Sequence, residues 1–222
     1  MNLGELERDF RVETGDLVPD YLFESEWVAR WLAEAQDEAA IRRRLLHESE
    51  NTDVCRTTVE QGRATYPLHP SLFEITSLRI RRSAGDRSRP LQIVSTEWLD
   101  SWREDWRDCE GCVEFAVQDD TTLRLVPRPA ESGELLLEGY RLPLKDLTTG
   151  IGAVPEIHLA HHRRLVQWAV FRAYGLPDVE TQDLARAAQA EREFTSYFGP
   201  RPDADLRRET RKDEPQHVTA WP

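Results

Sequence analysis

"CVEFAVQDDTTLRLVPRPAESGELLLEGYRLP", residues 112–143, is the stretch of sequence that decides the fold class. Its apolar runs CVEFAVQ, TLRLV and LLLEGY are separated by the turn signals DDT and AESGE, a pattern typical of short antiparallel strands. Val113, Phe115 and Val117 alternate with polar residues, so we expect these three side chains to point into a core. The stretch therefore predicts three consecutive strands that form a β-meander.

More strand signals precede this stretch. Residues 52–82 are rich in Thr, Val and Ile, with turn residues between short runs, which predicts further strands. Residues 96–106, TEWLDSWREDW, predict a short helix with three tryptophans four residues apart, Trp98, Trp102 and Trp106. We therefore expect residues 51–150 to form a small antiparallel β-domain.

Helical periodicity appears on both sides of this domain. Apolar residues predict a helix over residues 3–14 and a longer one over about residues 25–47, with Ser25 as the N-cap. After the β-domain, an apolar stripe runs from His162 to Ala173, and a second helix ends at Gly199. Asp178 is the expected cap between these two later helices.

The order of these segments predicts an α+β fold. Residues 1–50 and 151–199 are expected to pack together as a helical bundle, with the β-domain inserted between them. Residues 200–222 are charged and nearly free of apolar side chains, so we expect a flexible tail.

Composition limits the function classes. The chain has 41 acidic and 29 basic residues and a net charge of −12, which disfavours a general nucleic-acid-binding surface. No run approaches the roughly 20 apolar residues that cross a bilayer, and no secretory signal is visible, so no membrane partner is expected. Three cysteines without such a signal are typical of a protein that folds in the cytoplasm.

The motif CEGC, with Cys109 and Cys112, suggests three alternatives: half of a zinc site, a redox dithiol or a plain loop. A tetrahedral zinc site needs two more ligands, but Cys55 is the only other cysteine. A redox dithiol normally begins a helix after a strand, whereas this motif precedes a strand. Both chemical interpretations are therefore disfavoured.

A histidine cluster is the other candidate for chemistry. His158, His161 and His162 lie on one side of a predicted helix and would suit a divalent ion, so a metal-dependent enzyme is one alternative function. Leu159 and Ala160 occupy the positions where a zinc-dependent hydrolase helix carries its general base. We favour a structural role, in which His162 starts the buried stripe and the other two decorate the first turn, with no cofactor and no catalytic residues.

Two segments of the chain are candidate sites for binding a partner protein. The run RIRRSAGDRSR is the only concentrated positive segment, with Arg79, Arg81, Arg82, Arg87 and Arg89. In the tail, Val218 and Trp221 are isolated apolar residues that would suit docking onto another protein.

Four segments together resemble the head–tail adaptor (connector) proteins of tailed bacteriophages. The first is the helix ESEWVARWLAEAQDEAA, and the second is GRATYPLHPSLFEI, in which His69 stands where the family prefers Pro. The third is LRLVPRPAESGELLLEGYRLP, and the fourth is VPEIHLAHHRRLVQWAVFRAYG, with Trp168 in place of Tyr. The resemblance spans about residues 1–198 in the same order of elements.

This resemblance implies a structural virion protein of the neck that assembles in the host cytoplasm. Such adaptors form rings, commonly of twelve copies, between the portal and the next neck or tail protein, and genomic DNA passes through without specific binding. The resemblance also implies that Gly111 turns the chain before a strand and that Cys109 and Cys112 are incidental thiols. A stopper or tail-terminator subunit is a further alternative, although such proteins are usually smaller and mainly β.

Overall fold

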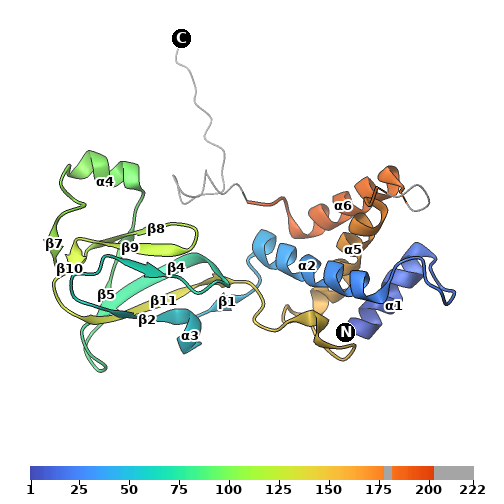
Figure 1. Ribbon diagram of the computed structural model, residues 1–222, viewed down its shortest axis with the longest axis horizontal. Helices are drawn as coiled ribbons and strands as arrows, with labels where there is room; N and C mark the ends of the chain where they lie inside the picture. The colour runs from blue at the N-terminus through green and yellow to red at the C-terminus, as the bar shows by residue number, and fades with distance from the viewer. Residues whose placement is uncertain (178–181, 203–222) are drawn as a thin grey trace, which may run out of the picture. The chain divides into compact units, whose positions relative to one another are not determined.

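The computed structural model describes residues 1–177 and 182–202, which form two compact units. The helical unit contains Met1–Leu46 and Arg141–Arg201, and the β unit contains His47–Tyr140 (Figure 1). The α+β class expected from the sequence is confirmed. Among the described residues, no helix is both long and apolar enough to span a bilayer.

The helical unit packs its helices around one core. Its helices are α1 (Leu3–Thr14), α2 (Ser25–Arg43), η1 (Leu147–Thr149), η2 (Leu159–Arg164), α5 (Leu165–Tyr174) and α6 (Leu184–Phe198). Helix α5 contacts α1, α2 and α6, and its apolar stripe supplies Leu165 and Ala169 to the core. Phe10, Leu32 and Phe194 are completely buried in the same cluster.

Helix α1 begins and ends as its sequence predicts. Asn2 and Glu5 form a reciprocal capping box at its N-terminus. Gly15 ends the helix in the left-handed conformation with φ 80°, which glycine adopts at low cost.

Helix α2 differs from the expectation at both ends. Glu24, not Ser25, is the N-cap residue, because the Ser25 hydroxyl is engaged elsewhere: it donates to Glu7 and accepts from Arg11. The helix ends at Arg43 rather than near residue 47, since Arg44 adopts a left-handed conformation and the chain then enters a strand.

The β unit contains two main sheets that share one core. Sheet one has the order β1-β11-β4-β5 with β2 also on β11, sheet two has the order β3-β9-β8-β6, and β7 and β10 form a third pair. The strands are β1 (His47–Glu48), β2 (Arg56–Val59), β3 (Thr65–Pro67), β4 (Leu72–Arg81), β5 (Arg89–Pro90), β6 (Gln92–Ile93), β7 (Glu110–Gly111), β8 (Phe115–Gln118), β9 (Thr122–Val126), β10 (Arg128–Pro129) and β11 (Gly133–Arg141). Leu78 and Leu135 from sheet one and Leu123 and Leu125 from sheet two lie in the same buried cluster.

The expected three-stranded meander is wrong in its third strand. β8 and β9 form the antiparallel hairpin, with Gln118 opposite Leu123, but β11 belongs to the other sheet. Pro127 directly follows β9 and has no backbone N–H to donate, which weakens any continuation of the β8–β9 ladder beyond Val126. Two further pairs, β6 with β8 and β7 with β10, are parallel.

Two short helices complete the β unit, α3 (Thr52–Cys55) and α4 (Thr96–Trp102). Helix α4 is shorter than the expected residues 96–106, because Arg103 is extended and Trp106 lies beyond the helix. Leu99 and Trp106 are buried against Val117 and Val126, so this cluster covers the face of sheet two that lies away from the shared core.

The predicted alternation of residues 113–117 is only partly correct. Val113 lies in the core between the sheets, as does Ala116. Phe115 and Val117 instead face the α4 cluster, because strand β8 is covered on both sides.

The expected cap of the last helix, Asp178, lies outside the described residues. Asp183 caps α6 by accepting a hydrogen bond from the Arg186 amide.

Candidate interaction site

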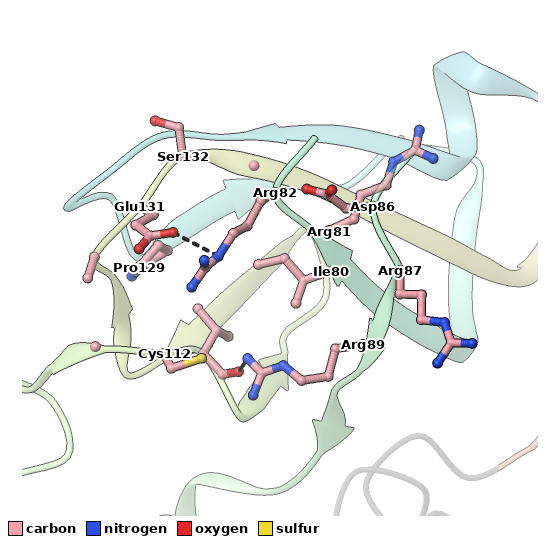
Figure 2. A pocket seen from close by; sticks show the side chains of 14 residues that line it. Ile80, Arg81, Arg82, Asp86, Arg87, Arg89, Cys112, Pro129, Glu131 and Ser132 are labelled. Carbon is pink, nitrogen blue, oxygen red and sulfur yellow. Dashed lines mark hydrogen bonds and ion pairs between the residues drawn. The ribbon is translucent and has the colours of Figure 1, made fainter. Parts of the chain in front are cut away.

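Four arginines of the positive run line one pocket at the surface of the β unit. Arg81, Arg82, Arg87 and Arg89 come from β4, from β5 and from the turn between them (Figure 2). The cavity has a volume of about 460 Å³ and is open to solvent. We call it the arginine pocket.

Two other segments close the pocket. Gly111 ends β7 and is followed by Cys112 and Val113, and residues 129–133 run from the end of β10 to the start of β11. The parallel pairing of Glu110 with Arg128 holds these two segments together. The arginine run and the CEGC motif, which lie apart in the sequence, therefore contribute to the same site.

Two of the pocket arginines are neutralised by carboxylates, Glu131 in the β10–β11 connection and Glu134 at the start of β11. Arg81 Nε lies 2.7 Å from Glu134 Oε2, with only 19% of the Arg81 side chain exposed. Arg82 Nε lies 2.8 Å from Glu131 Oε2 in a far more exposed pair (Figure 2). Exposed pairs of this kind contribute little to stability, so Arg82 can exchange Glu131 for another anion.

The remaining arginines differ in how they are held. Arg89 donates to the backbone oxygen of Val113, which ties β5 to the segment after β7. Arg79 lies outside the pocket lining and binds the hydroxyl and carbonyl oxygens of Ser88, both at 2.8 Å. Arg87 is exposed and has no hydrogen bond or ion pair with any residue that the structure describes. Arg87 is therefore the most available positive charge of the run.

The carboxylates beside these arginines could not be identified from the sequence pattern. Glu131 and Glu134 belong to the AESGE segment, whose composition predicts a turn. The sequence signal for this proximity was the presence of two acidic residues beside Gly133. In the structure, the Gly133 backbone lies so close to β4 that a Cβ added to it would be 2.6 Å from the Arg81 carbonyl oxygen. That close approach brings the turn next to the arginine run.

The two central residues of the CEGC motif form strand β7 rather than a turn. Gly111 lies in strand β7 opposite Pro129, and a Cβ at Gly111 would meet nothing within 4 Å, so the expected turning role of Gly111 is wrong. The Cys109 thiol donates to the carbonyl oxygen of Asp105, and Cys112 is exposed at the pocket. Cys109 and Cys112 are free thiols, and Cys55 is buried in the β unit.

The three histidines make separate contacts. His158 is the N-cap of η2, and its Nδ1 accepts from the Ala160 amide. His161 Nδ1 lies 3.0 Å from the Tyr197 hydroxyl, and burial together with the charge of Arg43 lowers the pKa of His161. His162 is buried, with Nε2 2.9 Å from the Ile157 oxygen.

These positions give no support to a metal centre in the part of the chain that is described. Within residues 1–177 and 182–202, no group of three His, Cys, Asp or Glu side chains is arranged to hold a metal ion. Val218 and Trp221, the candidate residues of the tail, lie outside the described residues.

By its fold, the chain is an α+β protein with a helical unit and a two-sheet unit, and its candidate site is a surface pocket lined by arginines. The chain belongs to the SU10 adaptor protein family, whose sequence model matches residues 1–218. This is a family of phage head–tail adaptors, which confirms the resemblance seen in the sequence. No curated protein matches the chain.

Proposed function

We propose that this phage adaptor protein forms a ring, of twelve copies, that joins the portal to the next neck or tail protein of the virion. The observation that carries the proposal is the family match over residues 1–218. A closed ring also fits a chain that offers different surfaces for neighbouring copies and for partners along the ring axis. The proposed location is the virion neck.

The proposed role toward DNA is passive. Each copy has a net charge of −12, so a ring of such copies repels the phosphate backbone and lets genomic DNA pass without binding. The proposal assigns no catalytic residue. In support, His158, His161 and His162 each make a different local contact.

The arginine pocket is the proposed contact for an acidic segment of the portal or of the downstream neck protein. Arg87 is unpaired within the described part of the chain, and Arg82 has only an exposed partner. Arg79, Arg81 and Arg89 are held by Ser88, Glu134 and Val113, and they position the turn. The tail residues Val218 and Trp221 are proposed as a second contact with a partner.

The proposal is tested with the portal protein of the same phage. Purified chain and portal are mixed and imaged by negative-stain electron microscopy, and rings stacked on the portal are the expected result. Absence of such complexes at micromolar protein would contradict the proposed function.

The pocket is tested by charge reversal. The double variant Arg82→Glu and Arg87→Glu should weaken binding to the portal or to the downstream protein by about tenfold. The reason is that two charge pairs between these arginines and the acidic segment of the partner are lost. The double variant Arg30→Glu and Arg192→Glu, at exposed positions of the helical unit, makes the same change in charge and is the matched control. If the pocket variant binds the portal and the downstream protein as tightly as the control variant does, the pocket is not a contact.

A further inference from the structure

The arginine pocket is apolar as well as charged. Four of the residues that line it have no polar side chain: Ile80, Val113, Pro129 and Ala130. Val113 is buried in the core between the two sheets, and Ile80 packs against the same cluster. A cavity with apolar side chains and a few charged groups is the usual form of a binding site. Charge alone therefore does not describe what this pocket accepts.

The cavity has room for a large side chain. Its volume of about 460 Å³ lies within the range of roughly 300–1,000 Å³ that is typical of ligand pockets. Gly111 also lines the cavity, and a Cβ there would meet no atom within 4 Å. Figure 2 shows Ile80 between Arg82 and Arg89, so apolar and charged groups meet in the same cavity.

The charged groups of the pocket have an excess of one positive charge. Four arginines line the cavity, and three acidic residues lie in the lining or pair with it: Asp86, Glu131 and Glu134. Arg87 and Arg89 have no carboxylate partner among the residues that the structure describes. The Asp86 carboxylate accepts a hydrogen bond from the Ser83 amide in its own turn. One further carboxylate therefore balances the charge of the pocket.

Arg89 is the pocket arginine that can bind such a carboxylate through two donors. Its Nη2 donates to the Val113 oxygen, and this bond fixes the guanidinium at the cavity (Figure 2). A guanidinium has five N–H donors in a planar fork that matches the geometry of a carboxylate. The N–H groups on Nε and Nη1 form no hydrogen bond with any described residue, so they remain for a ligand.

The affinity of this site has to come mainly from apolar burial. Exposed ion pairs contribute little, because water and salt screen the charges and the long side chains lose freedom. A large apolar side chain that leaves water for a cavity gains far more free energy. A purely acidic segment would therefore bind weakly here, and an apolar side chain beside the acid makes the difference.

We propose that the arginine pocket binds a protein segment in which a large apolar side chain lies next to a single Asp or Glu. The apolar side chain packs against Ile80, Val113 and Pro129, and the carboxylate binds Arg89. The inference rests on the proposed contact with a neck partner and names the kind of segment that this partner presents.

The test uses one variant that fills the cavity without changing its charge. Cys112 lines the pocket and is exposed, so Cys112→Phe occupies the space of the apolar side chain, and Cys112→Ser is the matched control. Circular dichroism and thermal unfolding should be the same for both variants, because position 112 lies outside the buried core.

The probes are three end-blocked peptides that separate the two requirements. Ser-Gly-Glu-Trp-Gly-Ser carries both groups, a second peptide has Ala in place of Trp, and a third has Gln in place of Glu. Amide NMR of the full chain follows the resonances of Cys112, Ala130 and Ser132, which line the pocket. The first peptide should shift them with a Kd at least about tenfold lower than either of the others. Cys112→Phe should abolish the shifts, and Cys112→Ser should retain them.

Each other result contradicts a distinct part of the inference. If the Ala peptide binds as tightly as the first, the apolar requirement is wrong. If the Gln peptide does so, the carboxylate requirement is wrong. If no peptide shifts these amides at millimolar concentration, or if Cys112→Phe binds as Cys112→Ser does, the pocket does not accept such a segment, and the adaptor function is untouched.

The same two variants are then compared in binding to the portal and to the downstream protein of the same phage. Cys112→Phe should lower the affinity for one of these proteins by at least about tenfold relative to Cys112→Ser, and the affected protein is the one that supplies the segment. Equal binding of the two variants to both proteins would show that neither partner inserts a side chain into the cavity. If wild type binds neither protein, the proposed function fails, whereas the peptides still decide what the pocket accepts.

Discussion

Asp37 is an acidic residue in an unfavourable position on α2. Partial burial, followed by the charges of Glu34, Glu38 and Asp146, raises the pKa of Asp37 from 3.8 to about 6. A carboxyl whose pKa is raised by folding destabilises the protein above that pKa. The destabilisation is complete above about pH 6 and disappears as pH falls through 6 toward the unfolded value of 3.8.

Asp37→Asn should therefore stabilise the protein at neutral pH. The expected gain is about 1 kcal/mol, because solvent at this half-buried position screens most of the shift. Urea unfolding of variant and wild type between pH 8 and pH 4 measures the difference. The gain should shrink as the pH falls; a gain that is constant over this range would show that the charge of Asp37 is not its cause.

Arg11 contributes more to stability than any exposed arginine should. It is 6% exposed and forms ion pairs with Glu7 and Asp16 at 2.7 and 2.8 Å. Arg11→Met should cost about 3 kcal/mol, since it leaves two carboxylates without their partner. The matched control is Arg30→Met, whose exposed pair with Glu26 should be worth less than about 0.5 kcal/mol. Similar losses for both variants in urea unfolding would contradict the role of Arg11.

At the scale of the elements, β4 and β11 approach each other only because β11 contains glycine. A Cβ on Gly139 would lie 2.1 Å from the carbonyl oxygen of Glu74, far inside van der Waals contact. Gly139→Ala should therefore force the strands apart and cost about 2 kcal/mol or more.

Gly111 provides the comparison for this prediction. It also lies in a strand, but a Cβ there would meet no atom within 4 Å. Gly111→Ala should change stability by less than about 0.5 kcal/mol. Thermal unfolding of both variants separates the two cases, and a large loss for Gly111→Ala would restore the turning role first expected for it.

The helices could be predicted from local sequence more fully than the sheets. The cap of α1 and the stripe of α5 depend on residues within one or two turns of each other. The pairing of β11 depends instead on residues far away in the sequence, because Leu135 pairs with Thr57 and the other neighbour of the strand is β4. The alternation within residues 133–141 shows a strand but carries no information about which sheet it joins.

At the scale of the whole molecule, the same distinction applies to the candidate site. The arginine run was visible in the sequence as a local excess of charge. Its pairing with Glu131 and Glu134 was not, because these carboxylates reach the run only through the folding of β11 onto β4. Sequence therefore located the positive segment, and the structure identified Arg87 as its available charge.

The helical unit has a core of its own and can be tested without the β unit. All residues of the buried helical cluster come from the helical unit, so its core does not depend on His47–Tyr140. The chain leaves and re-enters this unit at Leu46 and Arg141, where the Arg141 amide donates to the Leu46 oxygen at 2.9 Å. Antiparallel neighbours at this spacing can be joined by a two-residue turn.

Replacing His47–Tyr140 by Asn-Gly should therefore give a folded helical protein. The expected result is a helical circular dichroism spectrum and a cooperative thermal transition, since the core of α1, α2, α5 and α6 is intact. Phe10→Ala in the shortened chain is the control, and loss of this fully buried ring should abolish or strongly lower the transition. A shortened chain without a cooperative transition would show that the helical unit needs the β unit to fold.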